Sequence, residues 1–275
     1  MRTLIKALIF RFVLLVYSKI IKSSLRKATP ENLTQLKVEG DGNLIISPHS
    51  DDETIGCFGL TCEPSSDNNL RFLLLTESGG ENVRFNELVR SLNKSGYTSE
   101  VARLGIIDGQ LQHYYTSLKA EIKKYILEND IDTVFTTSIF DFHPDHRAAG
   151  YAVLELVEEG VLDKVYFYHT NHPINLKYAT HYSLLDAKMQ KLKLSALGLF
   201  ETQKGLNFEG LIKIGTLYLQ EIPGSKELFI CVDRENYKLI KGDFDNLKSV
   251  FKQNDYTKSV VHPFRVFKNI TFWIS

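Results

Sequence analysis

The sequence predicts an α/β fold: a mostly parallel, Rossmann-like sheet with helices on both faces, preceded by a basic apolar helix at the N-terminus. Short apolar runs of strand length alternate with longer segments of helical spacing along the chain. This alternation is typical of parallel strands joined by helical crossovers. An apolar share of 43% over 275 residues also gives enough material for a large core.

Four segments have the length and apolar content of buried strands. They are residues 44–47 (LIIS), 70–76 (LRFLLLT), 132–138 (DTVFTTS) and 164–170 (KVYFYHT). Continuous apolar runs of this kind are typical of parallel strands that are covered on both faces. Residues 206–232, around Pro223 and Gly224, predict two or three further consecutive strands, which we expect to form an antiparallel edge.

Four other segments have helical spacing. They are residues 81–104, 116–129, 144–160 and 183–200. The third begins at Pro144, and proline is favoured at the first position of a helix because its missing N–H is not needed there. The last forty residues predict no clear element, and we expect their aromatic tail, residues 266–275, either to pack on the core or to reach a membrane.

The N-terminal head differs in charge from the rest of the chain. The first thirty residues hold seven of the 33 basic residues and none of the 33 acidic ones, so the rest of the chain has a net charge of −7. We therefore divide the chain into a basic apolar helix at residues 1–30 and a single domain at residues 31–275.

The head is too interrupted by charge to span a bilayer in the usual way. Its longest uncharged run is residues 12–18, whereas a spanning helix needs about 20 apolar residues. No clean signal-peptide cleavage site follows it. We expect residues 1–27 to lie as a helix on an anionic membrane surface. The alternatives are a tilted single anchor and a helix that packs on its own domain.

Composition excludes several classes of function. The formal net charge is zero, and the body of the chain has no basic clusters beside its aromatic residues, so we expect no nucleic-acid partner. Cys57, Cys62 and Cys231 form no C-x-x-C pair and predict reduced thiols in a cytoplasmic protein, which the head would place on the inner face of the membrane. No nucleophile elbow is present, which argues against a serine hydrolase.

Two polar clusters follow two of the predicted strands. They are His49, Asp51, Asp52 and Glu53 after residues 44–47, and Asp141, His143, Asp145 and His146 after residues 132–138. Ligands of open α/β sheets bind at the carboxyl ends of the strands, so we expect the two clusters to converge. Either cluster alone would fit turn and N-cap residues. Together, such closely packed carboxylates repel one another unless a cation lies among them.

The residue types indicate a catalytic metal site. His49, Asp52 and His146 would give a divalent ion two nitrogens and one oxygen, with a fourth position for water, which is typical of catalytic zinc. Another divalent metal could occupy such a site. Asp51 fits the general base for the water. We expect His143 to stabilise the oxyanion or to protonate the leaving nitrogen, with Asp145 orienting its ring.

The same segments resemble a known family. Residues 47–59 (SPHSDDETIGCFG) and 142–150 (FHPDHRAAG) resemble the two main motifs of the PIG-L/LmbE family. Three further segments are similar to the family in the same order: residues 74–87 (LLTESGGENVRFNE), 106–112 (IIDGQLQ) and 191–203 (KLKLSALGLFETQ). Ser50 replaces the usual proline, and Cys57 and Phe58 stand among expected glycines, where we expect them to narrow the pocket.

The resemblance implies an LmbE-like fold and a zinc-dependent N-deacetylase that acts on an N-acetylglucosamine unit of a larger molecule. It implies the ligands His49, Asp52 and His146, and it places Arg84 near the sugar. We expect removal of acetyl from an N-acetylated amino sugar conjugate, which the basic head suggests is lipid-linked. The alternatives are a deacetylase or amidase of a soluble glucosaminide in thiol-cofactor metabolism, and a non-catalytic sugar-binding protein on the same fold.

Overall fold

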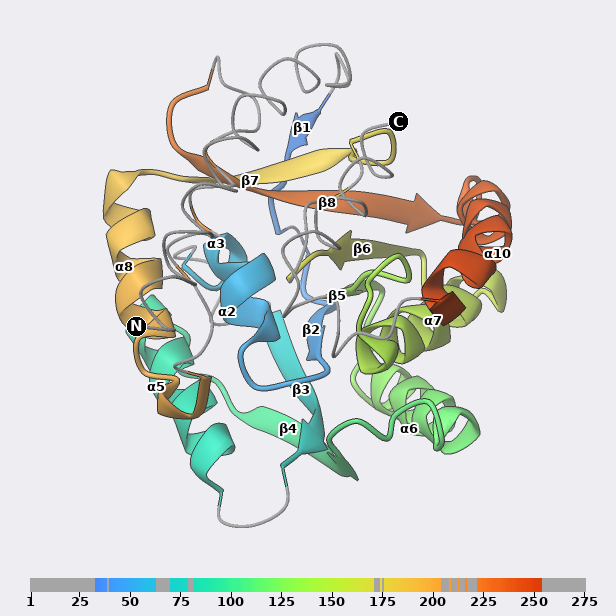
Figure 1. The fold of residues 1–275 in the computed structure, drawn as a ribbon, viewed down its shortest axis with the longest axis horizontal. Coiled ribbons are helices and arrows are strands. Elements are labelled where there is room, and N and C mark those ends of the chain that lie inside the picture. Colours follow the sequence, from blue (N-terminus) through green and yellow to red (C-terminus); the bar gives the residue numbers. More distant parts are fainter. Residues whose placement is uncertain are drawn as a thin grey trace.

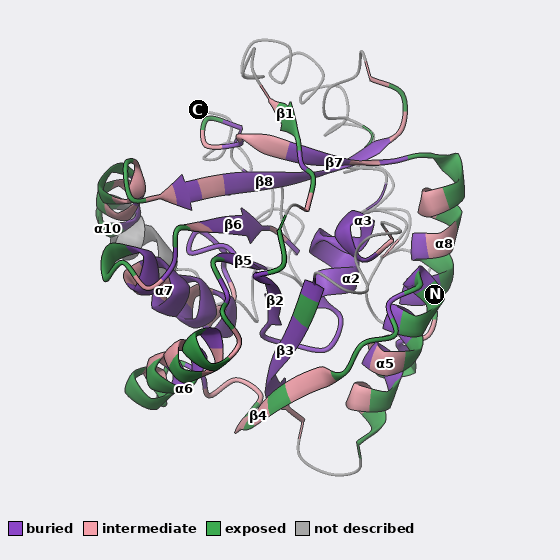
Figure 2. Ribbon diagram, turned by 180° about the vertical axis from the view of Figure 1, so that it is seen from behind, coloured by how far each residue is buried: buried purple, intermediate pink, exposed green. Residues whose placement is uncertain are grey.

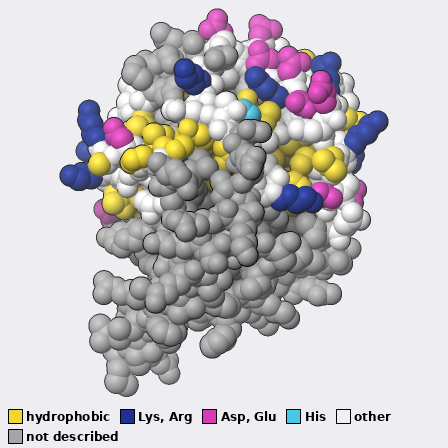
Figure 3. All heavy atoms as spheres, turned by 90° about the horizontal axis from the view of Figure 1, so that it is seen from above, with side chains coloured by type: hydrophobic (Ala, Val, Ile, Leu, Met, Phe, Trp, Pro, Cys, Tyr) yellow, Lys and Arg dark blue, Asp and Glu magenta, His cyan; other side chains and the backbone are white. Residues whose placement is uncertain are grey.

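The computed structural model describes most of the predicted domain. The described residues are 33–38, 40–62, 70–78, 82–170, 174, 176–203, 208, 212, 216 and 222–253. The basic head and the aromatic tail lie outside these ranges, so their expected membrane contacts stay predictions. Within the described part of the chain, no helix is both long and apolar enough to cross a membrane. Seen from above, its apolar side chains form a band among charged ones (Figure 3).

The described residues form an eight-stranded sheet at the centre of the molecule (Figure 1). The strands are β1 (Thr34–Gln35), β2 (Asn43–Ser47), β3 (Leu70–Glu77), β4 (Val101–Ile107), β5 (Thr133–Thr137), β6 (Lys164–Tyr168), β7 (His181–Leu185) and β8 (Ser225–Asp233). Their order is β1-β7-β8-β6-β5-β2-β3-β4. Every pairing is parallel except those of β8 with β6 and β7. The predicted mostly parallel sheet is confirmed.

Helices cover both faces of this sheet, as predicted (Figure 1). One layer contains α2 (Asp52–Gly56), α3 (Phe58–Thr61), α5 (Val83–Ser95) and α8 (Ala187–Leu197). The other layer contains α6 (Tyr115–Glu128), α7 (Pro144–Glu158) and α10 (Tyr237–Gln253). A short 3₁₀ turn, η1 (Glu201–Gln203), follows α8.

The sheet divides the core into two layers of side chains. Leu44 and Ile46 of β2 pack with the side chains of α6 and α7, whereas Ile45 packs with those of α5. Successive side chains of a strand point to opposite faces, so a strand that is covered on both sides needs an uninterrupted apolar run. Figure 2 shows the buried strands and the exposed outer faces of the helices.

The helix predicted at residues 81–104 is wrong in its second half. Helix α5 ends at Ser95, because Gly96 adopts a left-handed conformation (φ 105°) and its N–H donates to the carbonyls of Asn93 and Leu92. Glycine is the residue that most easily ends a helix in this way. The chain then forms β4, which pairs with β3 at the edge of the sheet. The residues of β4 alternate between half-buried and exposed positions, and their sequence did not predict a strand.

The structure also corrects three predictions for the C-terminal part of the chain. Residues 183–185 belong to β7, and α8 begins only after Asp186, whose carboxylate accepts the N–H of Met189 at 2.7 Å. Strand β8 is antiparallel, as expected, but it lies between β7 and β6 and not at an edge. Helix α10 was missed because its polar and apolar residues gave no clear start signal; its inner face contributes Ile240 and Phe244 to the core.

The two polar clusters meet because β2 and β5 are neighbours. The strands pair in parallel, with Asn43 opposite Thr133 and Ile45 opposite Phe135. Their carboxyl ends therefore lie at the same edge of the sheet. The loop after β2 carries His49, and the segment after β5 leads into α7 with His146, so the fold explains how residues far apart in sequence share one site.

Candidate metal centre

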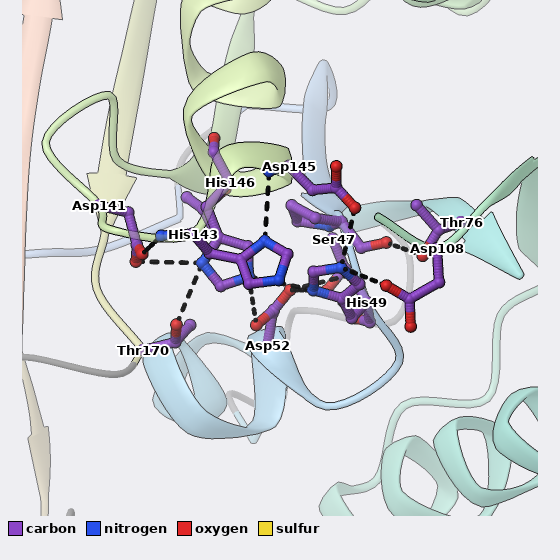
Figure 4. Close-up of polar contacts among 12 residues, drawn as sticks. Ser47, His49, Asp52, Thr76, Asp108, Asp141, His143, Asp145, His146 and Thr170 are labelled. Atoms are coloured by element: carbon purple, nitrogen blue, oxygen red, sulfur yellow. Dashed lines mark hydrogen bonds and ion pairs between the residues drawn. The ribbon is translucent and has the colours of Figure 1, made fainter. Parts of the chain in front are cut away.

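Three side chains present ligand atoms to one another at the carboxyl edge of the sheet (Figure 4). His49 follows β2, Asp52 is the first residue of α2, and His146 lies in the first turn of α7. The Nδ1 atom of His49 is 3.0 Å from Nε2 of His146 and 3.2 Å from Oδ2 of Asp52. The Nε2 atom of His146 is 3.2 Å from Oδ1 of Asp52.

These distances fit a divalent metal. Zinc binds histidine nitrogen and carboxylate oxygen at about 2.0–2.2 Å in tetrahedral sites, which places two ligand atoms about 3.3 Å apart. The three separations of 3.0, 3.2 and 3.2 Å lie close to that value. Two nitrogens and one oxygen also form the donor set of many catalytic zinc sites. The residues present therefore fit a metal ion, which His49, Asp52 and His146 would hold.

Both imidazole rings are oriented by carboxylates through their other nitrogens. Nδ1 of His146 lies 3.0 Å from Oδ2 of Asp141 and 3.3 Å from the hydroxyl of Thr170. Nε2 of His49 lies 3.2 Å from Oδ1 of Asp108 and 3.3 Å from Oδ2 of Asp145. Metal-binding histidines usually have such partners, which fix the ring and raise its basicity.

The cluster also shifts the pKa values of its members. Burial alone would lower the pKa of His146, but the charges of Asp52 and Asp141 outweigh it and raise the pKa to about 9. Burial likewise opposes the charged form of His49, yet Asp52 and its other carboxylate partners raise its pKa well above the usual value. Burial alone would raise the pKa of Asp52, but His146 and His49 lower it. The site is thus an acidic cluster that attracts cations.

The loop between β2 and α2 is fixed by hydrogen bonds of its own. The His49 N–H donates to Oδ2 of Asp52 at 2.8 Å, and the Ser47 hydroxyl donates to the His49 carbonyl at 2.8 Å. The Thr76 hydroxyl of β3 donates to the carbonyl of Pro48 at 2.6 Å. These contacts hold His49 and Asp52 in place relative to the sheet.

Asp51 lies beside the ligands with 6% of its surface exposed. Burial and the neighbouring charge of Asp52 raise its pKa to about 6. A carboxylate with a pKa near the working pH can both accept a proton and release it. The structure therefore gives Asp51 the environment that a general base needs.

His143 caps the start of α7 next to the metal ligands. Its ring centroid is 4.6 Å from that of His49 and 4.7 Å from that of His146. Nδ1 accepts the backbone N–H of Asp145 at 3.2 Å, so in the neutral ring the proton lies on Nε2. Burial and the charges of His146 and His49 lower the pKa of His143 to about 4. In the metal-free protein the ring is thus a neutral hydrogen-bond donor.

Asp145 is placed differently from the prediction. We expected its carboxylate to orient the ring of His143, but the contact with that ring comes from the backbone N–H of Asp145. The carboxylate accepts the N–H groups of Gly109 and Leu111 at 2.7 and 3.0 Å and lies against His49. The side chain of Asp145 therefore contacts His49 and ties the loop after β4 to α7.

Arg84 lies at the rim of the site, at the start of α5. Its Nη1 atom is 2.8 Å from Oδ2 of Asp108, whose other oxygen contacts His49. The hydrogen bond with His49 outweighs burial and lowers the pKa of Asp108 to about 2. Arg84 also lines a pocket together with Ser50, Thr76 and Asn82.

Sequence reasoning gave no role to Asp108, Asp141 or Thr170. The signal that could have identified Asp108 is its place immediately after β4, at the same sheet edge as the clusters. The sequence analysis predicts helix for most of that strand, so this signal is lost.

The expected narrowing of the pocket by Cys57 and Phe58 is wrong. Both are buried, with exposures of 0% and 1%, and pack in the core.

Part of the chain matches a known protein family. Residues 44–157 match the family described as "PIG-L: GlcNAc-PI de-N-acetylase". Among curated proteins, no sequence matches the chain.

Solved structures share the fold at low sequence identity. The N,N'-diacetylchitobiose deacetylase from Pyrococcus horikoshii is 20% identical, with a TM-score of 0.57 over 72% of this chain and 85% of that chain. The A40926 pseudoaglycone deacetylase Dbv21 is 18% identical, with a TM-score of 0.54 over 71% and 99%. The zinc-inhibited form of the teicoplanin deacetylase Orf2 is 16% identical, with a TM-score of 0.53 over 70% and 98%. At these identities the likeness shows the fold.

Proposed function

The chain belongs to the PIG-L family through residues 44–157, and from this premise we propose that it is a metal-dependent hydrolase that removes acetyl from an N-acetylated amino sugar. The observation that carries the proposal is the close approach of His49 Nδ1, His146 Nε2 and the two carboxylate oxygens of Asp52, at 3.0–3.2 Å between residues, flanked by Asp51 and His143. Each role that amide hydrolysis requires has a candidate residue in this arrangement.

In this proposal, the carboxylate of Asp52 binds the metal and that of Asp51 activates the water. Zinc held by His49, Asp52 and His146 would act as a Lewis acid and would lower the pKa of a bound water. Asp51 takes the proton from the attacking water, because its pKa of about 6 leaves it mostly ionised near neutral pH. The same carboxyl group then delivers the proton to the leaving amine nitrogen. The products are acetate and a free amino sugar.

His143 and Arg84 complete the proposed site. The Nε2–H of His143 donates a hydrogen bond to the oxyanion that forms on the acetyl oxygen; a positioned donor of this kind contributes about 3–4 kcal/mol to catalysis. Arg84 contacts the sugar from the rim, where Asp108 holds its guanidinium. Asp145 supports the reaction through His49 and through the backbone that fixes the His143 ring.

For the substrate we propose an N-acetylglucosamine conjugate that carries an apolar group. Two apolar residues that adjoin the proposed sugar contact in the chain are well exposed. Val83 precedes Arg84 and Ile107 precedes Asp108, and their exposures are 43% and 60%. Exposed apolar groups of this kind favour a lipid-linked substrate over a fully soluble one.

The basic head would bring the enzyme to such a substrate. We propose that residues 1–27 hold the protein on the cytoplasmic face of a membrane, since seven basic residues occur there without an acid. Full-length protein should co-sediment with vesicles that contain phosphatidylglycerol, and a variant without residues 1–30 should stay in the supernatant. Equal sedimentation of both proteins would contradict this role of the head.

The proposed function is tested by acetate release from a panel of N-acetylglucosamine compounds. The panel pairs free and nucleotide-linked sugar with lipid-linked forms. Release confined to lipid-linked compounds would support the whole proposal. Release from soluble glucosaminides alone would keep the chemistry and favour the thiol-cofactor alternative. Sugar binding without release of acetate by the metal-loaded protein would favour a non-catalytic binding protein.

A further inference from the structure

Helices α2 and α3 are separated by a break that is filled by a buried ion pair. At Cys57 the backbone leaves the helical conformation (φ −144°, ψ 31°). Lys193 of α8 and Glu227 of β8 lie at this break, with Nζ and Oε1 2.7 Å apart. Their exposures are 4% and 6%. Such a pair is costly to bury unless further hydrogen bonds satisfy both groups.

Both groups are satisfied by the two helix ends. The Lys193 ammonium donates to the carbonyl of Ile55, near the C-terminus of α2, at 2.6 Å. The Glu227 carboxylate accepts the N–H groups of Phe58 and Gly59, at the start of α3, at 3.0 and 2.9 Å. A cation at the carbonyl end of one helix and an anion at the N–H end of the next both match the helix dipoles.

The ion pair is linked to the proposed metal centre through the backbone of Ile55. Ile55 accepts the Lys193 hydrogen bond through its carbonyl, and its own N–H donates to the carbonyl of Asp51 at 3.0 Å. Asp52 begins the same short helix. A displacement of the far end of this five-residue helix would therefore move the proposed base and a proposed metal ligand together.

Close packing leaves the two helices little room to move toward the sheet. A Cβ atom on Gly56 would lie 2.3 Å from the Tyr168 ring, and one on Gly59 would lie 2.0 Å from the Ser183 hydroxyl. The sheet thus limits α2 and α3 on one side. Lys193 and Glu227 fix the two helix ends at the break between them.

We propose that Lys193 and Glu227 are positioning residues that set the location of Asp51 and Asp52 in the metal centre. The inference rests on the proposed function in assuming that these two carboxylates bind metal and activate water. Both residues lie beyond residues 44–157, which match the family model, although Lys193 falls within residues 191–203, whose sequence is similar to the family. The C-terminal part of the chain would then complete a site whose reacting groups all come from the N-terminal part.

The test compares four full-length variants with the wild type. Lys193→Met and Glu227→Gln remove one charge each, and Glu227→Gln keeps an acceptor for the α3 N–H groups. Lys193→Arg keeps the positive charge. Ile126→Ala is the control for lost stability, because Ile126 is a core residue near the far end of α6. Zinc affinity is measured by competition with a chromophoric chelator, and kcat and KM are measured separately.

We expect Lys193→Met and Glu227→Gln to weaken zinc binding about tenfold or more and to lower kcat more than they change KM. Amide exchange in residues 52–61 should be faster in both metal-free variants. Lys193→Arg should keep most of the wild-type zinc affinity. Ile126→Ala should lower the melting temperature without changing zinc affinity or kcat.

Folded Lys193→Met and Glu227→Gln proteins with wild-type zinc affinity and kcat would overturn the proposal. If Lys193→Met does not fold, the milder Glu227→Gln decides. The zinc measurement separates this inference from the proposed function. A wild-type protein that binds zinc but releases no acetate would contradict the deacetylase, while the affinities of the variants would still test the positioning role.

Discussion

The Nδ1 atom of His49 and the Nε2 atom of His146 lie 3.0 Å apart, although 97 residues separate them in sequence. The second nitrogen of each ring lies against carboxylates, Asp108 and Asp145 for His49 and Asp141 for His146. The two nitrogens that face each other are therefore those positioned to bind a metal together with Asp52.

Asp141→Asn should weaken metal binding about 10- to 100-fold, because an amide orients His146 less strongly than a carboxylate does. Zinc affinity measured by chelator competition checks this prediction. Asp163→Asn is the matched control, since Asp163 is exposed and contacts only the surface residue Arg234 among the ion pairs found in the described residues. Equal zinc affinities of the two variants would show that Asp141 does not support the site.

Asp51→Asn should retain the metal and lose turnover. General-base catalysis contributes about 10²- to 10⁴-fold to a rate, and asparagine has nearly the same shape but cannot take a proton. The measurement is acetate release per bound metal, so that any loss of metal is corrected for. A variant that keeps more than about a tenth of the wild-type rate would remove Asp51 from the role of base.

Metal binding should release protons. Burial alone would lower the pKa of His146, but Asp52 and Asp141 raise it to about 9, so the metal-free ring holds a proton near neutral pH. A metal must displace that proton. Apparent zinc affinity should therefore rise with pH until the pH reaches about 9, where proton competition ends.

Calorimetry in buffers of different ionisation enthalpy counts these protons. At least one proton should leave for each zinc bound at neutral pH, since His49 also has a raised pKa. A binding enthalpy that does not depend on the buffer would mean that the ligands are unprotonated in the metal-free protein. That result would contradict the electrostatic description of the cluster.

Two glycines in helices should respond in opposite ways to alanine. A Cβ atom on Gly150 of α7 would lie 2.5 Å from the Thr137 carbonyl oxygen and 2.9 Å from the Ile139 nitrogen. Because both atoms belong to the backbone, Gly150→Ala should lower the free energy of unfolding by about 1–3 kcal/mol. It should also weaken metal binding, since α7 carries His146.

Gly242→Ala in α10 is the matched control. Among the residues that the structure describes, no atom lies within 4 Å of a Cβ at this exposed position, so alanine should raise the free energy of unfolding by about 0.5–1 kcal/mol through its higher helix propensity. Urea denaturation measures both variants. A Gly150→Ala protein as stable as Gly242→Ala would show that α7 can move away from β5 at little cost.

The sequence predicts that the three proposed ligands meet, because the relevant signals are local. His49 and Asp52 directly follow one apolar strand, and His146 lies in a helix that begins at a proline after another. The rule that parallel strands end at one edge then brings them together. The same reasoning missed Asp108, because the strand before it has half-buried, alternating residues and follows a helix without a proline break.

The buried contact between Lys193 and Glu227 shows what local patterns cannot predict. Lys193 occurs in a helix among other lysines, and Glu227 occurs near the start of a strand, where both would normally face solvent. Only the tertiary structure shows that they are buried and meet at the break between α2 and α3. A charge that is buried by contacts between distant elements leaves no periodic signal in the sequence.

The most direct test of the central claim is acetate release as a function of bound metal. Protein stripped with a chelator is titrated with zinc in small steps. We expect no release without metal and a rate that rises linearly to one equivalent, with acetate and free amine formed in equal amounts. A rate that does not depend on metal would show that the protein is not a metal-dependent deacetylase.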